Sequence, residues 1–119
     1  MIRVYLLEDN DGLREDTTFA LNAEGLVVRG AANGLDFADL CANELPDVAV
    51  IDRMLPGEDG LSIARSLRAP TVAKKIGIVF LTSLGALNQK LEGLEFGDAY
   101  LVKPVDMREL AAVIRSVYR

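Results

Sequence analysis

Short apolar runs recur along the chain, separated by segments in which apolar residues fall at helical spacing. Most of these runs are almost continuously apolar rather than alternating, which is typical of parallel strands covered on both faces. Arg29 in the second run predicts that this strand lies at an edge of the sheet. The runs are Ile2–Leu7, Leu26–Arg29, Val48–Ile51, Ile76–Leu81 and Ala99–Val102.

Apolar residues spaced three and four apart predict a helix after each run. The last helix is the clearest, because Asp106 and Glu109 form a capping-box pattern and Val105 is placed to pack on Leu110. Five strands alternating with five helices predict a single doubly wound α/β domain over residues 1–119. The helical stripes are Leu13, Thr17, Ala20 and Leu21; Phe37, Leu40 and Cys41; Leu61, Ala64 and Leu67; Leu87, Leu91 and Leu94; and Leu110, Val113, Ile114 and Val117.

The composition of the chain excludes several kinds of ligand and of catalytic group. A net charge of −5 makes the chain a poor direct ligand for nucleic acid or an anionic membrane. The absence of histidine excludes catalysis, metal binding or phosphate storage by that side chain, and the single cysteine excludes an internal disulfide. The first apolar run meets Glu8 and Asp9 too early for a signal peptide or a membrane span. We therefore expect a soluble, cytoplasmic domain.

Polar residues follow four of the five predicted strands. Because ligands of an open parallel sheet bind beyond the carboxyl ends of its strands, these residues should share one site. Oxygen ligands without histidine or cysteine favour Mg²⁺, a lysine can hold a phosphate oxygen, and a carboxylate can accept a phosphoryl group. The pattern predicts an Mg²⁺-dependent phosphoryl site with Asp52 as acceptor. The residues are Glu8 and Asp9, Asp52, Thr82 and Ser83, and Lys103, which precedes Pro104.

Taken singly, each of these residues also has an ordinary structural explanation. Acidic residues such as Glu8, Asp9 and Asp11 commonly cap a helix. Asp52 precedes a Pro-Gly loop and fits a turn, and a lysine before a proline, as at Lys103, is usually solvated. The constellation, rather than any one member, favours the metal and phosphoryl site.

The chain resembles, over essentially its whole length, the receiver domain of a two-component response regulator. Four segments carry the resemblance in the order and spacing of that family: Leu7–Asn10, Ile51–Gly60, Leu81–Ser83 and Tyr100–Pro104. The resemblance implies the flavodoxin-like fold, a five-stranded parallel sheet with strand order 2-1-3-4-5 flanked by five helices.

The resemblance also implies roles for individual residues. Glu8, Asp9 and Asp52 would bind Mg²⁺ together with the backbone carbonyl of Met54. Asp52 would take its phosphoryl group from a phosphohistidine on a sensor histidine kinase or a phosphotransfer protein. By the same resemblance, Lys103 would contact the phosphoryl group on Asp52.

The remaining family roles concern the switch. Thr82 would be drawn toward the phosphoryl group and Tyr100 would change rotamer, although an aromatic residue in a strand is more often packed in the core. The change would shift the face of the fourth helix, fifth strand and fifth helix and so control an effector domain or a downstream protein, in transcriptional regulation. Such a protein catalyses only its own phosphorylation and dephosphorylation.

The sequence departs from the family pattern in three places, two of which, the short segment and Val113, bear on self-association. The segment Phe96–Tyr100 is one residue shorter than usual, and it lacks one of two adjacent acids. Val105 stands where phenylalanine is most common, and Val113 stands where related regulators carry an arginine that pairs with the missing acid. Although the family implies a second copy as a partner on activation, we expect the usual symmetric dimer not to form.

Other functions remain open at this stage. The chain can be a stand-alone receiver or a pseudo-receiver that acts through protein–protein contacts alone. A small Mg²⁺-dependent phosphatase would need a second acid two residues after the nucleophile, where this chain has Met54. A carrier of flavin mononucleotide would need a hydroxyl- or glycine-rich loop after the first strand, where the acidic segment 8–11 would repel the phosphate.

Overall fold

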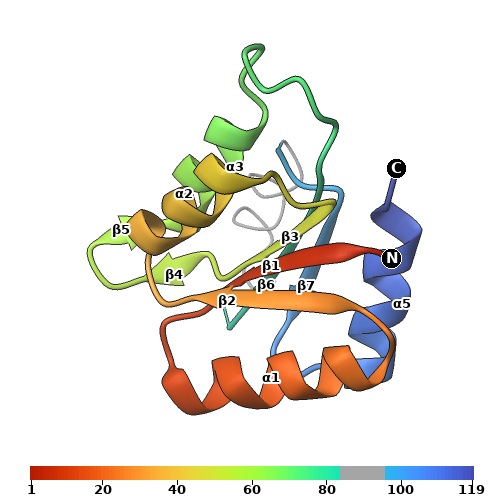
Figure 1. The fold of residues 1–119 in the computed structure, drawn as a ribbon. Helices are drawn as coiled ribbons and strands as arrows, with labels where there is room; N and C mark the ends of the chain where they lie inside the picture. The colour runs from red at the N-terminus through yellow and green to blue at the C-terminus, as the bar shows by residue number, and fades with distance from the viewer. Residues whose placement is uncertain (84–95) are drawn as a thin grey trace.

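The computed structural model describes residues 1–83 and 96–119. Its centre is a parallel sheet of five strands in the order β2-β1-β3-β6-β7 (Figure 1). This order is the predicted one, so the doubly wound, flavodoxin-like fold is confirmed, with the Arg29 strand at an edge. The strands are β1 (Arg3–Leu7), β2 (Val27–Ala31), β3 (Val48–Ile51), β6 (Gly77–Thr82) and β7 (Ala99–Val102).

Helices cover both faces of the sheet (Figure 1). One face packs against α1 (Asp11–Ala23) and α5 (Met107–Val117), and the other against α2 (Gly34–Asn43) and α3 (Gly60–Leu67). These four helices match four of the five predicted ones. The predicted stripe of Leu87, Leu91 and Leu94 lies outside the described residues. Every helix in the described ranges is too short or too polar to cross a lipid bilayer.

The two central strands explain the continuous apolar runs. Every residue of β3 and β6 is buried, because helices lie over both faces of the sheet at this point. Alternate side chains therefore enter two separate cores: Val48 and Val50 face the α1–α5 side, whereas Ala49 and Ile51 face the α2–α3 side. An apolar run without alternation is the sequence consequence of this burial.

Polar side chains cap the helices, and the cap of α1 shows whether Glu8 or Asp9 has that role. Asn10 caps α1 by accepting a hydrogen bond from the backbone N–H of Leu13 at 2.9 Å. Glu8 and Asp9 are therefore not the cap of α1. The predicted cap of α5 is confirmed, because Asp106 accepts from the backbone N–H groups of Arg108 and Glu109.

The structure differs from the predicted pattern in several places. β2 runs on to Ala31, where small residues carry no strand signal. A hairpin of two short strands, β4 (Met54–Leu55) and β5 (Glu58–Asp59), was not predicted, because two-residue strands are too short to show a period. Gly57 turns this hairpin with a φ of 74°, a conformation that favours glycine. Leu13, predicted to lie on the buried stripe of its helix, is 39% exposed.

The first residue of α3 generates a stability prediction. A Cβ atom at Gly60 would lie 2.2 Å from the backbone carbonyl oxygen of Asp52, which cannot move without shifting the end of β3. We expect Gly60→Ala to lower the free energy of unfolding by about 1–3 kcal/mol, as overpacked buried positions do. Urea-induced unfolding measures the change.

Gly12→Ala is the matched control. The nearest heavy atom to a Cβ at Gly12 lies at an ordinary 3.6 Å, and the residue sits inside α1. Alanine is the better helix former, so this variant should be more stable by up to about 1 kcal/mol. Equal stability of the two variants would contradict the close packing of Gly60 on the Asp52 loop.

Candidate metal and phosphoryl site

Three of the predicted site residues are held by hydrogen bonds that extend the sheet. Each lies one position beyond the end of its strand and donates its backbone N–H to the neighbouring strand: Glu8 to the Ala31 oxygen at 3.0 Å, Asp52 to the Leu7 oxygen at 3.0 Å, and Lys103 to the Thr82 oxygen at 2.8 Å. The backbone of the site is therefore as firmly placed as the sheet itself.

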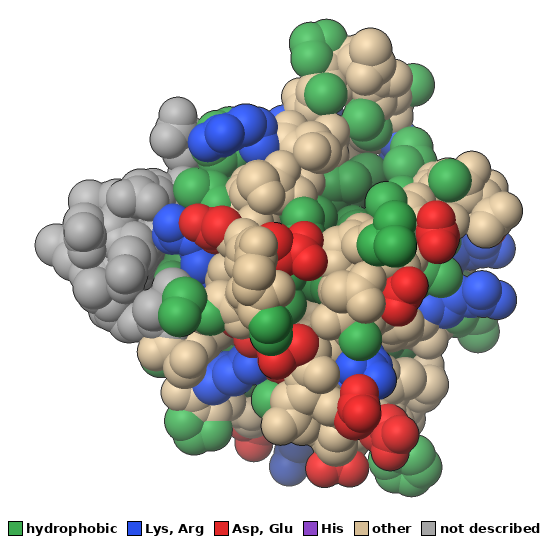
Figure 2. Space-filling model, turned by 90° about the vertical axis from the view of Figure 1, so that its left-hand side faces the viewer, with side chains coloured by type: hydrophobic (Ala, Val, Ile, Leu, Met, Phe, Trp, Pro, Cys, Tyr) green, Lys and Arg blue, Asp and Glu red, His purple; other side chains and the backbone are tan. Residues whose placement is uncertain are grey.

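The structure brings the three predicted carboxylates together at this edge. One oxygen from each of Glu8, Asp9 and Asp52 can be chosen so that all three lie within 4.8 Å of one another. Figure 2 looks onto this edge and shows acidic side chains gathered in the middle of the face. Glu8 and Asp52 are only 4% and 7% exposed, whereas Asp9 is exposed. A set of carboxylate oxygens with no nitrogen or sulfur suits a hard cation such as Mg²⁺, so the residues present fit that ion.

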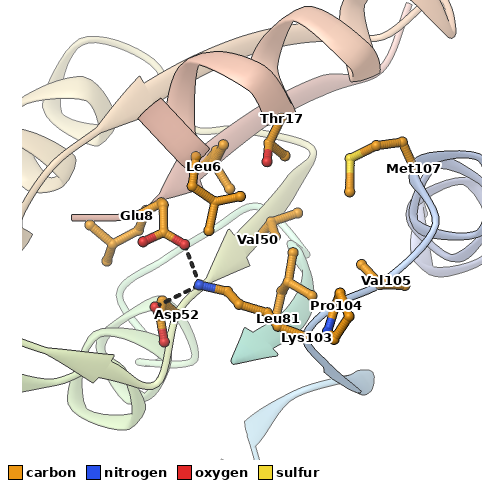
Figure 3. A pocket seen from close by; sticks show the side chains of 12 residues that line it. Leu6, Glu8, Thr17, Val50, Asp52, Leu81, Lys103, Pro104, Val105 and Met107 are labelled. Carbon is orange, nitrogen blue, oxygen red and sulfur yellow. Dashed lines mark hydrogen bonds and ion pairs between the residues drawn. The ribbon is translucent and has the colours of Figure 1, made fainter. Parts of the chain in front are cut away.

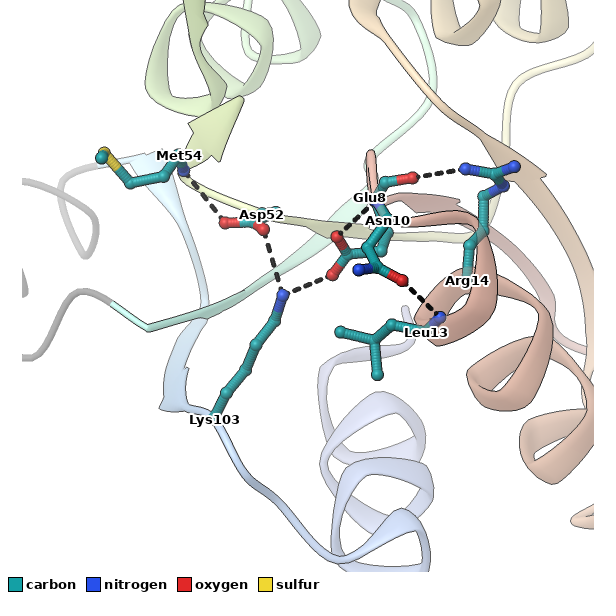
Figure 4. A network of polar contacts seen from close by, with 7 residues as sticks. All are labelled: Glu8, Asn10, Leu13, Arg14, Asp52, Met54 and Lys103. Carbon is teal, nitrogen blue, oxygen red and sulfur yellow. Dashed lines mark hydrogen bonds and ion pairs between the residues drawn. The ribbon is translucent and has the colours of Figure 1, made fainter. Parts of the chain in front are cut away.

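Lys103 supplies the positive charge of the site. Its ammonium group forms ion pairs with Glu8 and with Asp52, the latter at 3.1 Å from Nζ to Oδ2 (Figures 3 and 4). Burial by itself would lower the pKa of Lys103, but the hydrogen bonds to the two carboxylates outweigh burial and raise the pKa above its ordinary value. The stability gained from this pairing is complete below the unfolded pKa of lysine and is lost as pH rises through the raised pKa.

An apolar pocket of about 210 Å³ adjoins these charges (Figure 3). It extends from the site toward Met107, between α1 and the loop that joins β7 to α5. Its apolar lining limits the water that reaches Lys103, and charges interact more strongly where water is excluded. Besides Glu8, Asp52 and Lys103, the lining consists of Leu6, Leu7, Leu13, Thr17, Val50, Leu81, Pro104, Val105 and Met107.

The β4–β5 hairpin orients the Asp52 carboxylate. The backbone N–H of Met54 donates to Asp52 Oδ1 at 3.0 Å, while Asp52 Oδ2 faces Lys103 (Figure 4). The two oxygens of the carboxylate thus have different partners. Met54, predicted to offer its backbone carbonyl to a metal, lies beside Asp52, and its side chain is 58% exposed.

The two predicted switch residues lie on neighbouring strands. Thr82 is fully buried and is the last residue of β6, whereas the predicted strand ends at Leu81. Thr82 pairs in register with Val102. Tyr100 on β7 is 6% exposed, and its ring lies 5.9 Å from that of Phe80. Tyr100 is therefore packed in the core, as is usual for an aromatic residue in a strand.

Arg53 is a site residue that the sequence reasoning missed. It follows Asp52 directly and is 6% exposed, with Nε 3.0 Å from Asp59 Oδ1. Burial raises the pKa of Asp59, but the hydrogen bond from Arg53 outweighs burial and lowers the pKa. Burial also raises the pKa of Tyr100, and a hydrogen bond with Arg53 opposes that rise. A charged residue in a polar loop indicates a solvated side chain, so no local signal pointed to this buried cluster.

Removal of the central cation tests the electrostatics. We expect Lys103→Met, without added metal at pH 7, to lower the free energy of unfolding by about 2–4 kcal/mol, because Glu8 and Asp52 then stay buried without the cation that bridges them. Lys74→Met is the control: Lys74 pairs with Asp47 at 2.7 Å, but its side chain is 40% exposed, so the loss should stay below about 1 kcal/mol. Equal losses in urea unfolding would contradict the buried pairing.

Comparison with known proteins places this chain in a family. The family model described as response regulator receiver domain matches residues 4–115. Response regulator MprA of Mycobacterium sp. (strain KMS) is 34% identical over 119 residues, which are 99% of this chain and 51% of that protein. The DNA-binding dual master transcriptional regulator RpaA of Synechocystis sp. (strain ATCC 27184 / PCC 6803 / Kazusa) is 31% identical over 120 residues, covering 100% of this chain and 50% of RpaA.

The chain thus spans about half the length of the curated relatives it matches. Among solved structures, the receiver domain of Francisella response regulator 1452 superposes with a TM-score of 0.89 at 27% identity, over 99% of this chain and 97% of that one. Since the family model covers nearly the whole sequence and the fold agrees, the chain belongs to the family of response regulator receiver domains.

Proposed function

We propose that this domain is a phosphorylation-dependent switch in which Asp52 accepts a phosphoryl group from a sensor histidine kinase or a phosphotransfer protein. The observation that carries the proposal is the convergence at Asp52. Its Oδ2 lies 3.1 Å from the Lys103 ammonium, and its carboxylate belongs to a group of three whose oxygens lie within 4.8 Å. A nucleophile, a set of metal ligands and a cation for the phosphoryl oxygens therefore occupy one site.

The transfer moves a phosphoryl group from nitrogen to oxygen. An Asp52 carboxylate oxygen forms a bond to phosphorus, the bond from phosphorus to the imidazole nitrogen breaks, and the imidazole leaves on the partner. These 119 residues contain no histidine, so the phosphohistidine lies outside this domain. Mg²⁺ held by Glu8, Asp9, Asp52 and the carbonyl of Met54 would offset negative charge on the phosphoryl oxygens. Positioning and charge neutralisation are most of what such a transfer requires.

Lys103 would exchange one anionic partner for another. It now bridges the Glu8 and Asp52 carboxylates, so its ammonium already lies beside the oxygen of Asp52 that it would share with a new anion. A lysine acts as a point charge toward phosphate and needs no fixed geometry to do so. We infer that Lys103 turns from the carboxylates to a phosphoryl oxygen when Asp52 is modified.

Thr82 and Tyr100 would carry the signal away from the site. Thr82 ends the strand that pairs with β7, and Tyr100 lies on β7 itself. In our proposal Thr82 is drawn toward the phosphoryl group and Tyr100 changes rotamer, which alters the surface formed by β7 and α5. Their burial on neighbouring strands supports this coupling.

The output of the switch is proposed from the relatives. Because those proteins are about twice as long and one is named a DNA-binding transcriptional regulator, we propose that the switch controls an effector domain or a downstream protein in transcriptional regulation. We assign the domain no turnover beyond its own phosphorylation and hydrolysis. A phosphatase would need an acid two residues after Asp52, whereas Met54 stands there and its thioether cannot donate a proton.

Covalent labelling tests the acceptor. We expect the wild-type chain to gain the mass of one phosphoryl group from acetyl phosphate with Mg²⁺, and to gain nothing when the metal is chelated. Asp52→Asn should take no label because it lacks the carboxylate nucleophile. Asp47→Asn, which alters a half-buried aspartate outside the site, should be labelled like the wild type. Intact mass spectrometry gives the result, and no label on the wild type would favour a pseudo-receiver.

Self-association yields a separate prediction. Asp98 is engaged within the chain, with its carboxylate oxygens 2.8 Å from Arg68 and 2.6 Å from Arg119, and Val113 is half-buried against the core. Neither residue is set up for an ion pair with a second copy. We expect the beryllofluoride-activated domain to remain monomeric at micromolar concentration in sedimentation velocity, like Asp52→Asn under the same conditions. A symmetric dimer formed only by the activated wild type would contradict this prediction.

A further inference from the structure

Arg14 makes contacts that its place in the sequence does not explain. It lies in α1, and its side chain is only 19% exposed. One guanidinium nitrogen donates to the backbone carbonyl oxygen of Glu8 at 2.9 Å (Figure 4), and the other pairs with Asp11 at 2.7 Å. Asp11 is the first residue of α1, whereas Glu8 lies outside the helix, so the bond to the Glu8 carbonyl connects α1 to the acidic segment that follows β1.

The carbonyl that Arg14 holds has a particular position in the site. It belongs to the peptide group that joins Glu8 to Asp9, the two neighbouring carboxylates of the acidic cluster. The peptide group is planar, so fixing its oxygen restricts the rotation that sets the directions of both side chains. Glu8 is held on its other side as well, since its N–H donates to the Ala31 oxygen and its carboxylate accepts from the N–H of Asn10 at 3.1 Å.

Gly30 gives Arg14 the room to reach this carbonyl. A Cβ atom at Gly30 would lie 3.0 Å from both Cγ and Cδ of Arg14, closer than ordinary contact. The backbone of Gly30 pairs regularly in β2, opposite Leu6 in β1, so the strand itself does not require glycine there. The stem of Arg14 therefore lies against β2 at a residue that has no Cβ atom, and this packing is a contact separate from the hydrogen bonds.

We propose that Arg14 is a positioning residue for the metal site: by fixing the peptide group between Glu8 and Asp9, it holds both carboxylates in the arrangement that a divalent cation needs. The inference rests on the proposed function in one respect, namely that this cluster binds Mg²⁺. The inference adds to the metal site a residue, Arg14, that gives no ligand atom and acts through the backbone. Partners that orient metal ligands from behind typically change metal affinity by about 10- to 100-fold when removed.

Metal affinity, rather than phosphorylation, is the measurement. Mn²⁺ substitutes for Mg²⁺ at oxygen sites, and the electron paramagnetic resonance signal of free Mn²⁺ reports binding to the whole chain without any phosphodonor. We expect Arg14→Ala to bind Mn²⁺ about tenfold more weakly than the wild type. Arg14→Lys should fall between the two, because one ammonium group lacks the fork that reaches both Glu8 and Asp11.

Gly30→Ala tests the same contact without removing a charge or a ligand. The added methyl group should displace the Arg14 stem and weaken Mn²⁺ binding several-fold, but it should have no further effect in the Arg14→Ala background. Arg29→Ala is the charge control: it removes a cation from the neighbouring position of β2 and should leave the affinity within about twofold of the wild type. Urea unfolding of each metal-free variant checks that the fold is retained.

The outcomes separate this inference from the proposed function. Mn²⁺ binding by Arg14→Ala within about twofold of the wild type overturns the positioning role and leaves the phosphoacceptor proposal intact. Equal losses in Arg14→Ala and Arg29→Ala also overturn it, because net charge would then be the cause. A wild-type chain that binds no divalent cation refutes both proposals. A loss confined to the Arg14 and Gly30 variants supports the positioning role.

Discussion

The arrangement of charges in the site is governed by the repulsion among carboxylates at one edge of the sheet. Two of them, Glu8 and Asp52, are nearly buried, and like charges about 4 Å apart cost roughly 4 kcal/mol at the effective dielectric near a protein surface. Lys103 bridges this pair and offsets part of the repulsion. In the proposed function the remaining repulsion would favour an added cation and would let Lys103 exchange its partners for another anion.

The scaffold supplies the stiffness that such a site requires. Ladder hydrogen bonds continue one residue past the strands at Glu8, Asp52 and Lys103, so these side chains start from fixed backbone positions. Two glycines permit close approach behind them: Gly60 under the Asp52 loop and Gly30 beneath Arg14. Packing at these points fixes where the charges lie, and electrostatics then decides which ions the site accepts. The fold and the chemistry are therefore set by different residues.

Sequence patterns predicted those features that repeat or that occur in a fixed order. Continuous apolar runs gave the parallel strands, and the polar residues after them gave Glu8, Asp9, Asp52 and Lys103, because topology alone brings strand ends together. Contacts that depend on a single long side chain produce no repeating pattern in the sequence, so they could not be predicted from it. The inward turn of Arg53 and the reach of Arg14 to a backbone oxygen are tertiary events, since each joins residues on different elements and neither changes a local period.

Arg53 shows how a buried cation can link the site to the surface that would carry its output. Asp52 and Arg53 are neighbours in the chain, yet they face different partners: Asp52 meets Lys103, whereas Arg53 meets Asp59 and the Tyr100 hydroxyl. Arg53 therefore connects the site to Asp59 in the β4–β5 hairpin and to Tyr100 on β7. Because Asp59 also caps α3, the ion pair lies at the start of that helix. A buried ion pair need not add net stability, so what this one contributes is a connection among three elements.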